Sequence, residues 1–279
     1  MFFLYQIILS ILFLISPIII IFRIIINKEH KKRFIEKFSR PSKKRIKGKL
    51  IWFHAASVGE ILSIIPLIKN YEKNTSIDQI MITTGTLSSS KVFEKFKFKK
   101  TIHQFYPLDH FYLTKKFLNY WKPNLAIFID SEIWPSMFIN LNNKKIPLIL
   151  LNARITNKTF NRWMMLKKFS QKIFNKITVA FPQNLETKFF LNRLKVKKIN
   201  HIGNLKFAEN NYYDQDKISD NLKFQLKNKK IWIASSTHAQ EEIFCAKAHI
   251  ELKKNVKNLI TIIIPRHVHR SKDIISKIK

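Results

Sequence analysis

The sequence predicts an α/β protein with a parallel sheet covered by helices. Short apolar runs alternate with helical patterns between residues 50 and 181, and this alternation is typical of doubly wound sheets. An apolar stretch at residues 1–22 and a second strand–helix–strand series after residue 230 add a membrane segment and a second lobe. The strands of the first lobe are expected at residues 50–54, 79–83, 101–105, 125–129, 146–151 and 177–181.

Residues 1–26 are expected to form a membrane anchor. Residues 1–22 approach the length needed to cross a bilayer, and their apolar run is interrupted only by Tyr5, Gln6, Ser10, Ser16 and Pro17. A cleaved signal peptide would have basic residues before this run and small residues at a cleavage site. Neither feature is present, so an anchor is favoured. The basic residues that follow it place the rest of the chain in the cytoplasm by the positive-inside rule.

The remaining chain divides by composition into four segments. Residues 27–49 read as a basic linker, and residues 50–207 as the first Rossmann-like lobe. A polar interdomain linker is expected at residues 208–229, and the second lobe at residues 230–279. Two strands are too few to close a doubly wound domain, so the second lobe is expected to be incomplete.

The chain is strongly basic, with 51 Lys and Arg against 18 Asp and Glu and a formal net charge of +33. Such a charge suits nucleic acid or an anionic membrane surface. The alternative is that lysine fills solvated faces in a chain also rich in Ile, Asn and Phe. No stacking platform or zinc-finger spacing is visible, so nucleic acid is not expected as a partner, whereas attraction to acidic lipid is. The single Cys245 excludes an internal disulfide and a cysteine metal cluster.

Polar residues follow the first strand of the predicted sheet. Ligands of open parallel sheets bind beyond the carboxyl ends of the strands, so His54, Ser57 and Glu60 are expected in a cleft. Gly59 is expected to let a ligand approach the backbone closely. A carboxylate in the first turn of a helix is also a common cap. Both interpretations of Glu60 stay open.

Three further loops of the first lobe are expected at the same edge. They contain Thr83 to Thr86, Asp130 and Glu132 before Trp134, and Asn152 with Arg154. Neighbouring carboxylates could bind a metal or sugar hydroxyls, but acidic residues before Trp134 are equally plausible as helix caps.

The second lobe carries two loops suited to an anion. Ser236, Thr237 and His238 precede a helix with Glu241 in its first turn, where free amides suit phosphate or carboxylate. Pro265, Arg266 and His267 end the next strand, and an arginine there could hold a phosphate through two hydrogen bonds. The alternative is a solvated basic turn.

These motifs together resemble the Kdo (3-deoxy-D-manno-octulosonic acid) transferase family of lipopolysaccharide assembly. The resemblance covers the chain from the anchor to the end and rests on seven motifs in family order. They are His54 to Glu60, Thr83 to Thr86, Glu132 to Pro135, Asn152 to Arg154, Gly203 to Phe207, Ser236 to His238 with Glu241 and Glu242, and Pro265 to His267.

The resemblance implies a glycosyltransferase B fold with two Rossmann-like lobes, anchored to the inner membrane. It implies inverting transfer of Kdo from CMP-Kdo to the lipid A precursor (lipid IVA), with no metal and no cofactor. On this basis Glu60 is expected to be the general base. Acceptor-binding residues are expected to be His54, Ser57, Gly59, Thr84, Gly85, Thr86, Glu132, Asn152 and Arg154. Donor-binding residues are expected to be Ser236, Thr237, His238, Glu241, Pro265, Arg266 and His267.

The sequence departs from the family pattern in several places. Asp130 stands where the family usually has Glu, Ser136 where it has Asn, and Ser88 where a second glycine is common. A glycine-rich loop and an Asn-x-x-Glu-Pro element of the second lobe are not found. The alternative function is therefore a catalytically lapsed, membrane-tethered remnant that still binds lipid. Binding of the lipid A precursor without turnover would favour that alternative.

Overall fold

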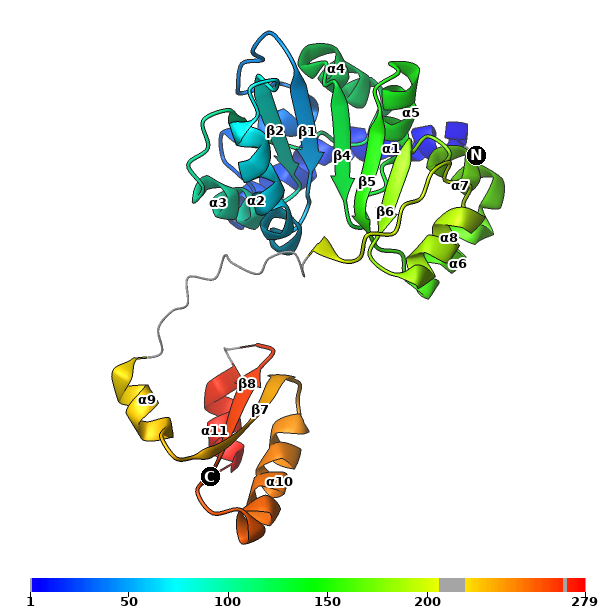
Figure 1. Ribbon diagram of the computed structural model, residues 1–279. Coiled ribbons are helices and arrows are strands. Elements are labelled where there is room, and N and C mark those ends of the chain that lie inside the picture. The colour runs from blue at the N-terminus through cyan, green and yellow to red at the C-terminus, as the bar shows by residue number, and fades with distance from the viewer. Residues whose placement is uncertain (1, 206–218, 268–269, 279) are drawn as a thin grey trace. The chain divides into compact units, whose positions relative to one another are not determined.

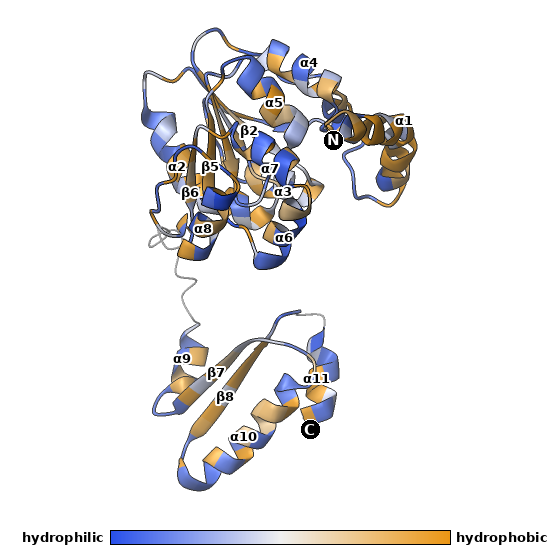
Figure 2. Cartoon of the chain, turned by 90° about the vertical axis from the view of Figure 1, so that its right-hand side faces the viewer, coloured by the Kyte–Doolittle hydropathy of each residue, from blue (hydrophilic) through white to orange (hydrophobic). Residues whose placement is uncertain are grey.

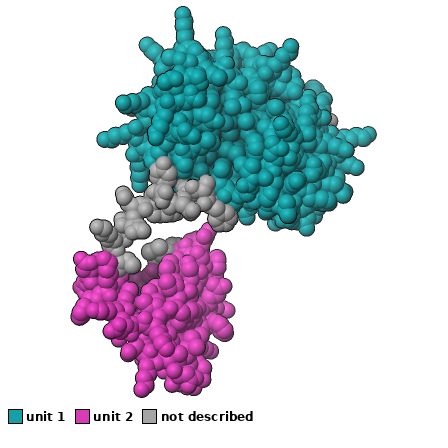
Figure 3. Space-filling model, viewed as in Figure 1, with its two compact units in different colours: residues 1–210 teal, residues 211–279 magenta. Residues whose placement is uncertain are grey.

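A computed structural model of the protein describes residues 2–205, 219–267 and 270–278. The chain forms two compact units, residues 1–210 and 211–279, which Figure 3 colours separately. Residues 208–218 of the predicted interdomain linker lie outside the described residues, as do Lys206 and Phe207 of the motif that begins at Gly203.

Unit 1 is built on a six-stranded parallel sheet with the order β3-β2-β1-β4-β5-β6 (Figure 1). The predicted α/β class and parallel sheet are thus present. β5 begins two residues later than expected because Pro147 has no N–H to donate to a neighbouring strand. The strands are β1 (Leu50–His54), β2 (Gln79–Thr84), β3 (Thr101–Phe105), β4 (Leu125–Ile129), β5 (Leu148–Ala153) and β6 (Val179–Pro182).

Both faces of the sheet are buried, which explains why its strands read as continuous apolar runs. In β1, Leu50 and Trp52 belong to one hydrophobic core, whereas Ile51 and Phe53 belong to another. Side chains of α4, α5, α6, α7 and α8 fill the first core, and those of α2 and α3 the second. The helices are α2 (Val58–Lys73), α3 (Leu87–Glu94), α4 (Phe111–Trp121), α5 (Pro135–Asn143), α6 (Asn157–Met165), α7 (Lys167–Phe174) and α8 (Leu185–Arg193).

The N-terminal helix α1 (Phe2–Ile25) is long and apolar enough to cross a membrane, and Figure 2 colours most of it as hydrophobic. It packs along unit 1 by one face, where its polar side chains lie. The Tyr5 hydroxyl donates to the Asp109 carboxylate at 2.8 Å, and the Gln6 amide donates to Ser136 Oγ at 2.9 Å. The opposite face exposes large apolar side chains, including Phe3, Leu4, Ile11, Leu14, Ile18 and Phe22.

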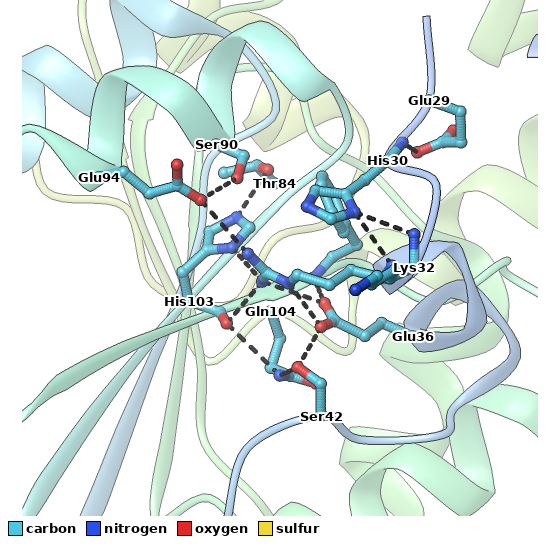
Figure 4. A network of polar contacts seen from close by, with 12 residues as sticks. Glu29, His30, Lys32, Glu36, Ser42, Thr84, Ser90, Glu94, His103 and Gln104 are labelled. Atoms are coloured by element: carbon cyan, nitrogen blue, oxygen red, sulfur yellow. Dashed lines mark hydrogen bonds and ion pairs between the residues drawn. The ribbon is translucent and has the colours of Figure 1, made fainter. Parts of the chain in front are cut away.

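The segment at residues 27–49, expected to be a basic linker, is docked on unit 1. It contains the 3-10 helix η1 (Arg33–Phe38), in which Glu36 is buried. The Glu36 carboxylate accepts hydrogen bonds from Arg33 Nε at 2.8 Å and from the Phe105 backbone N–H at 2.6 Å. Arg33 also donates to Nδ1 of the buried His103 at 2.6 Å (Figure 4). The hydrogen bonds of Arg33 therefore attach this segment to the edge strand β3.

Unit 2 is smaller and contains a two-stranded parallel sheet, β7 with β8. The strand–helix–strand series that the sequence predicts in this lobe is present as β7, α10 and β8. The elements are α9 (Asp220–Leu226), β7 (Lys230–Thr237), α10 (Glu241–Asn255), β8 (Leu259–Pro265) and α11 (Ser271–Ile278).

Candidate functional site

The candidate site of unit 1 lies where the strand order reverses. The chain runs from β1 outward to β3, then returns to pair β4 on the other side of β1. The loops after β1 and β4 therefore diverge at the carboxyl edge of the sheet, and a crevice at such a switch point is where doubly wound folds bind ligands. His54 ends β1, and Glu132 follows β4.

Glu60 lies in the first turn of α2 and takes part in its cap. Ser57 is the N-cap residue and accepts the Glu60 backbone N–H at 3.3 Å. In return, the Glu60 carboxylate accepts the Ala56 N–H at 2.8 Å and the Ser57 hydroxyl at 2.6 Å. This reciprocal pattern resembles a capping box, with the Ala56 N–H in place of the N–H of the N-cap residue Ser57. The cap interpretation left open by the sequence is therefore realised, and it fixes the position of the carboxylate.

The environment of Glu60 makes its carboxylate a better base. Burial raises the pKa of Glu60 above its ordinary value, and the negative charges of Glu132 and Asp130 raise it further. The two hydrogen bonds of the cap oppose this shift without cancelling it. The interaction with Glu132 and Asp130 also means that Glu60 lies on the same edge as the β4 loop.

The pKa of Glu132 is shifted in the opposite direction to that of Glu60. Its Oε2 accepts hydrogen bonds from His54 Nε2 at 3.1 Å and from Trp134 Nε1 at 2.8 Å. Burial alone would raise the pKa of Glu132, but these donors outweigh it and leave the pKa below the ordinary value. Glu132 is thus an ionised acceptor that orients His54, while Glu60 holds a proton more readily. Neighbouring carboxylates with divergent pKa values are typical of acid–base sites.

The loop after β2 contributes mostly internal contacts. Thr84 is fully buried, and its hydroxyl lies 2.9 Å from His103 Nε2. Thr86 caps α3 by accepting the Ser89 N–H at 3.3 Å. A methyl group built on Gly85 would lie 4.0 Å from the Ala56 side chain. Of these three predicted acceptor residues, Thr84 positions the loop, and Gly85 and Thr86 lie nearer its surface.

Asn152 and Arg154 lie at the end of β5, beside the β4 loop. Asn152 is 2% exposed and has a left-handed backbone with φ of 53°, at a register shift between β5 and β6. Its side-chain oxygen accepts the Leu205 N–H at 3.1 Å. Arg154 is exposed, and its carbonyl accepts the Ser131 hydroxyl at 2.6 Å. Asn152 therefore holds the segment after α8 at Leu205, whereas the Arg154 side chain faces solvent at the edge.

The predicted donor residues of unit 2 lie at the carboxyl ends of β7 and β8 and in the two loops that follow these strands. Ser236 has a left-handed backbone with φ of 60°, and the His238 N–H donates to the Glu241 carboxylate at 2.8 Å. The Arg266 N–H donates to the Thr237 carbonyl at 3.0 Å, which joins the loops after β7 and β8. Arg266 and His267 are exposed, and Pro265 ends β8.

Arg270 has a structural role that the sequence does not reveal. Its guanidinium donates to both carboxylate oxygens of Glu242, at 3.0 and 3.1 Å. The Thr237 hydroxyl donates to the same carboxylate at 3.0 Å. These contacts tie the start of α10 to the segment after β8, so Glu242 is engaged within unit 2.

Several residues near the site are not predictable from their motifs. The buried Glu29 accepts hydrogen bonds from Lys37 and from Arg23. Lys37 Nζ also lies 3.4 Å from the Gly85 carbonyl oxygen. Glu29 and Glu36 are the only acidic residues between 27 and 49, and this isolation within a basic run is the one signal that could have revealed them. The Tyr106 ring stacks on His54, with 4.0 Å between centroids.

No group of three or more His, Cys, Asp or Glu side chains within the described ranges could hold a metal ion.

Comparison with known proteins identifies the family. The family model described as 3-deoxy-D-manno-octulosonic-acid transferase (kdotransferase) matches residues 31–209, more than half of the chain. The chain is a member of the Kdo transferase family. The matched segment contains Glu60 and all the acceptor-side candidates, whereas the donor-side candidates of unit 2 lie beyond it.

Curated Kdo transferases are similar over most of the chain. The 3-deoxy-D-manno-octulosonic acid transferase of Rickettsia bellii is 37% identical and aligns with 94% of this chain and 63% of its own length. The probable mitochondrial enzyme of Arabidopsis thaliana is 34% identical over 99% of this chain and 64% of its own length. The Haemophilus influenzae enzyme is 30% identical over 79% and 52%. This Kdo transferase family member thus spans about half to two thirds of the length of these relatives.

Solved structures of other proteins have a fold similar to that of this Kdo transferase family member. A putative UDP-N-acetylglucosamine 2-epimerase from Listeria monocytogenes matches with a TM-score of 0.60 at 12% identity, over 82% of this chain and 65% of its own. The structure of S. aureus MnaA with UDP matches with a TM-score of 0.57 at 14% identity, over 82% and 65%. These neighbours have a glycosyltransferase B type architecture, so the predicted fold class is confirmed.

Proposed function

We propose that the chain acts as an inverting glycosyltransferase that moves Kdo from CMP-Kdo to the lipid A precursor, lipid IVA. The observation that supports this most strongly is Glu60, a carboxylate of raised pKa held at the switch point of the sheet beside an ionised Glu132. Family membership gives the reaction class.

In the proposed reaction Glu60 is the general base. A hydroxyl of the acceptor sugar attacks the anomeric carbon of Kdo as its proton passes to the Glu60 carboxylate. The new bond joins that oxygen to the anomeric carbon, and the bond from this carbon to the CMP phosphate oxygen breaks, so CMP leaves with the electron pair. A positioned base of this kind contributes about 10² to 10⁴ in rate. The proposal includes no metal or cofactor.

The neighbouring groups would support this base. The Ala56 N–H and Ser57 hydroxyl fix the orientation of the Glu60 carboxylate. The negative charge of Glu132 makes loss of the Glu60 proton harder and so strengthens Glu60 as a base. Gly85, Thr86 and Arg154 are proposed to line the acceptor side of the cleft, and the buried His54 and Asn152 to position its loops.

CMP-Kdo is anionic through its phosphate and its sugar carboxylate. Unit 2 offers exposed Arg266 and His267 beside the loop of Ser236 and Thr237. A guanidinium binds phosphate through two directed hydrogen bonds, so we assign the donor to these loops, with His238, Glu241 and Pro265 completing them.

The protein is proposed to work at the cytoplasmic face of the inner membrane. The exposed apolar face of α1 would enter lipid, and the basic residues after it would meet acidic headgroups, each worth about 1 kcal/mol near the surface.

The test is Kdo transfer from labelled CMP-Kdo to lipid IVA by the whole chain. Glu60→Gln is expected to lower the rate about a hundredfold or more, because the amide cannot accept the proton. The amide oxygen can still accept the Ala56 N–H, so the fold should persist. The matched control is Glu186→Gln, which changes an exposed glutamate in the first turn of α8 and should leave the rate unchanged.

Near-normal transfer by Glu60→Gln would remove Glu60 from this role. Binding of labelled lipid IVA by the wild-type chain with no transfer would support the lipid-binding remnant instead.

A further inference from the structure

A cavity of about 320 Å³ lies between α1 and the rest of unit 1. We call it the α1 cavity. Most of its exposed wall area is apolar, and α1 supplies Leu9, Leu12, Phe13, Ile19 and Ile20 to it. The charged residues Arg23, Glu29, Lys37 and Asp109 also line it, and each of them is hydrogen-bonded within unit 1. A volume of this size falls in the range of ligand pockets, and an apolar lining suits hydrocarbon.

The polar residues that line the α1 cavity connect it to the candidate site at two places. Trp134 lines the cavity and donates its indole N–H to Glu132. Lys37 also lines it, and its ammonium lies 3.4 Å from the Gly85 carbonyl oxygen. The cavity thus touches both the β4 loop and the β2 loop of the acceptor side.

A second hollow, of about 340 Å³, shares Arg23 with the α1 cavity. We call it the basic hollow. Its lining includes three cations and no acidic residue, together with the hydroxyl side chains of two residues at the start of α3. Among the described residues, the ammonium groups of Lys28 and Lys91 have no ion pair or hydrogen bond. The full lining is Arg23, Asn27, Lys28, Thr86, Leu87, Ser88 and Lys91.

We propose that these two hollows form one binding site for the acceptor lipid, with an acyl chain in the α1 cavity and a phosphate in the basic hollow. This assignment rests on the proposed function and names the part of the acceptor that each hollow holds. Arg23 lies at the junction, as the first charged residue after the apolar run of α1. Lys28 and Lys91 pair with no acid among the described residues and so complement a phosphate, whereas Arg23 also donates to Glu29. An apolar cavity complements hydrocarbon.

The position of the basic hollow suits delivery of a sugar to Glu60. Thr86 lines the hollow and caps α3 by accepting the Ser89 N–H. The Ser89 hydroxyl donates to the Ala56 carbonyl at 2.9 Å, and the Ala56 N–H donates to Glu60. This chain of hydrogen bonds, through Ser89 and Ala56, connects the lining of the basic hollow to the Glu60 carboxylate.

The experiment measures binding of fluorescent lipid IVA to the whole chain in detergent, without CMP-Kdo. Leu12→Trp fills the α1 cavity, and Lys91→Glu reverses a charge in the basic hollow. Each is expected to weaken binding about tenfold, the effect of roughly 1.4 kcal/mol. One control is Ile18→Trp, because the Ile18 side chain is 70% exposed on the opposite face of α1. The other is Lys95→Glu, because Lys95 is the C-cap residue of α3 and does not line the hollow. Both controls should bind within about twofold of the wild type.

Equal binding by all variants and the wild type would overturn the assignment. An equal loss of binding by Lys91→Glu and Lys95→Glu would also overturn it, because it would indicate a diffuse attraction of basic residues to lipid. The same variants are tested on phosphatidylglycerol vesicles, where site and control variants should behave alike. If Leu12→Trp binds weakly there too, the α1 cavity holds membrane lipid and not the acceptor.

A second measurement does not depend on any variant folding correctly. Lipid IVA with a photoreactive group on an acyl chain is expected to label Leu9 to Ile20 of α1 or Trp134 in the wild-type chain. Labelling confined to other parts of the described chain would contradict the site. Labelling of these residues in a chain that transfers no Kdo would support the lipid site and contradict the transferase proposal. The experiment therefore distinguishes failure of the lipid site from failure of the proposed function.

Discussion

Glu60 and Glu132 show how neighbouring residues of the same type acquire different chemistry. Glu60 receives hydrogen bonds from a backbone N–H and a hydroxyl, yet burial and the nearby carboxylates keep its pKa raised. Glu132 receives an imidazole and an indole N–H, and its pKa is lowered. The difference comes from the donors around each carboxylate and not from the residue type.

Gly48 and Gly59 differ in whether the fold requires a glycine at that position. A methyl group on Gly59 would meet no atom within 4 Å, so folding does not require glycine there. Gly48 has φ of 108°, and a methyl group on it would overlap the Asp78 carboxylate.

Gly59→Ala is therefore expected to keep or slightly raise the free energy of unfolding, because alanine is the better helix former by up to about 1 kcal/mol. Kdo transfer should fall, because the methyl group would occupy the space through which a ligand approaches the backbone. Gly48→Ala is expected to destabilise the chain by about 1 kcal/mol or more, since its φ suits only glycine. Urea unfolding and transfer assays on both variants check this. Full activity of Gly59→Ala would refute the close approach.

At the scale of elements, the docked segment at residues 27–49 depends on one buried histidine. Arg33 of η1 donates to His103 Nδ1 and also to the His103 carbonyl at 2.9 Å. On its other side, His103 Nε2–H donates to Thr84 of the β2 loop. Figure 4 shows His103 beside Thr84. The neutral ring thus accepts a hydrogen bond at Nδ1 and donates one from Nε2. Protonation of His103 would place a second positive charge against the Arg33 guanidinium.

The pH dependence of stability tests this network. Burial, assisted by the charge of Arg33, lowers the pKa of His103 to about 3. An unfolded histidine titrates near 6.5, so the unfolded state binds more protons between about pH 3 and 6.5. The free energy of unfolding should fall as pH drops from 6.5 toward 3, and His103→Gln should flatten that fall.

The measurement is urea unfolding of the wild type, His103→Gln and the exposed control His201→Gln at pH 7.5 and pH 5. Burial raises the pKa of Asp109 to about 6, which gives a slope of opposite sign, but this slope is common to all three proteins. Only the difference between wild type and His103→Gln reports on His103. Identical slopes in those two proteins would contradict the neutral, buried ring.

At the scale of the whole molecule, the sheet was predictable because its strands are buried on both faces. Continuous apolar runs such as Leu125–Ile129 reveal such strands directly, and the polar loops between them reveal the carboxyl edge. The inward turn of Thr84 and Asn152 was not predictable. Their partners, His103 and the Leu205 N–H, are distant in sequence, and a polar residue at a strand end reads the same whether it faces a ligand or the protein.

The same limit applies to the basic surface of the chain. The sequence shows a net charge of +33 and an apolar N-terminus, but not which cations are paired. Arg33 and Lys37 pair with buried glutamates, whereas Lys28 and Lys91 line the basic hollow. Only the fold separates structural cations from those that can meet a ligand.

The role of Glu60 is tested most directly by the pH dependence of Kdo transfer by the wild type and by Glu60→Gln. A base must be ionised to accept a proton, so the wild-type rate should fall as pH drops through the Glu60 pKa, with a midpoint above the ordinary glutamate value of 4.5. Glu60→Gln should retain only a low rate that lacks this acidic limb. An acidic limb of the same midpoint in Glu60→Gln would show that another group is the base.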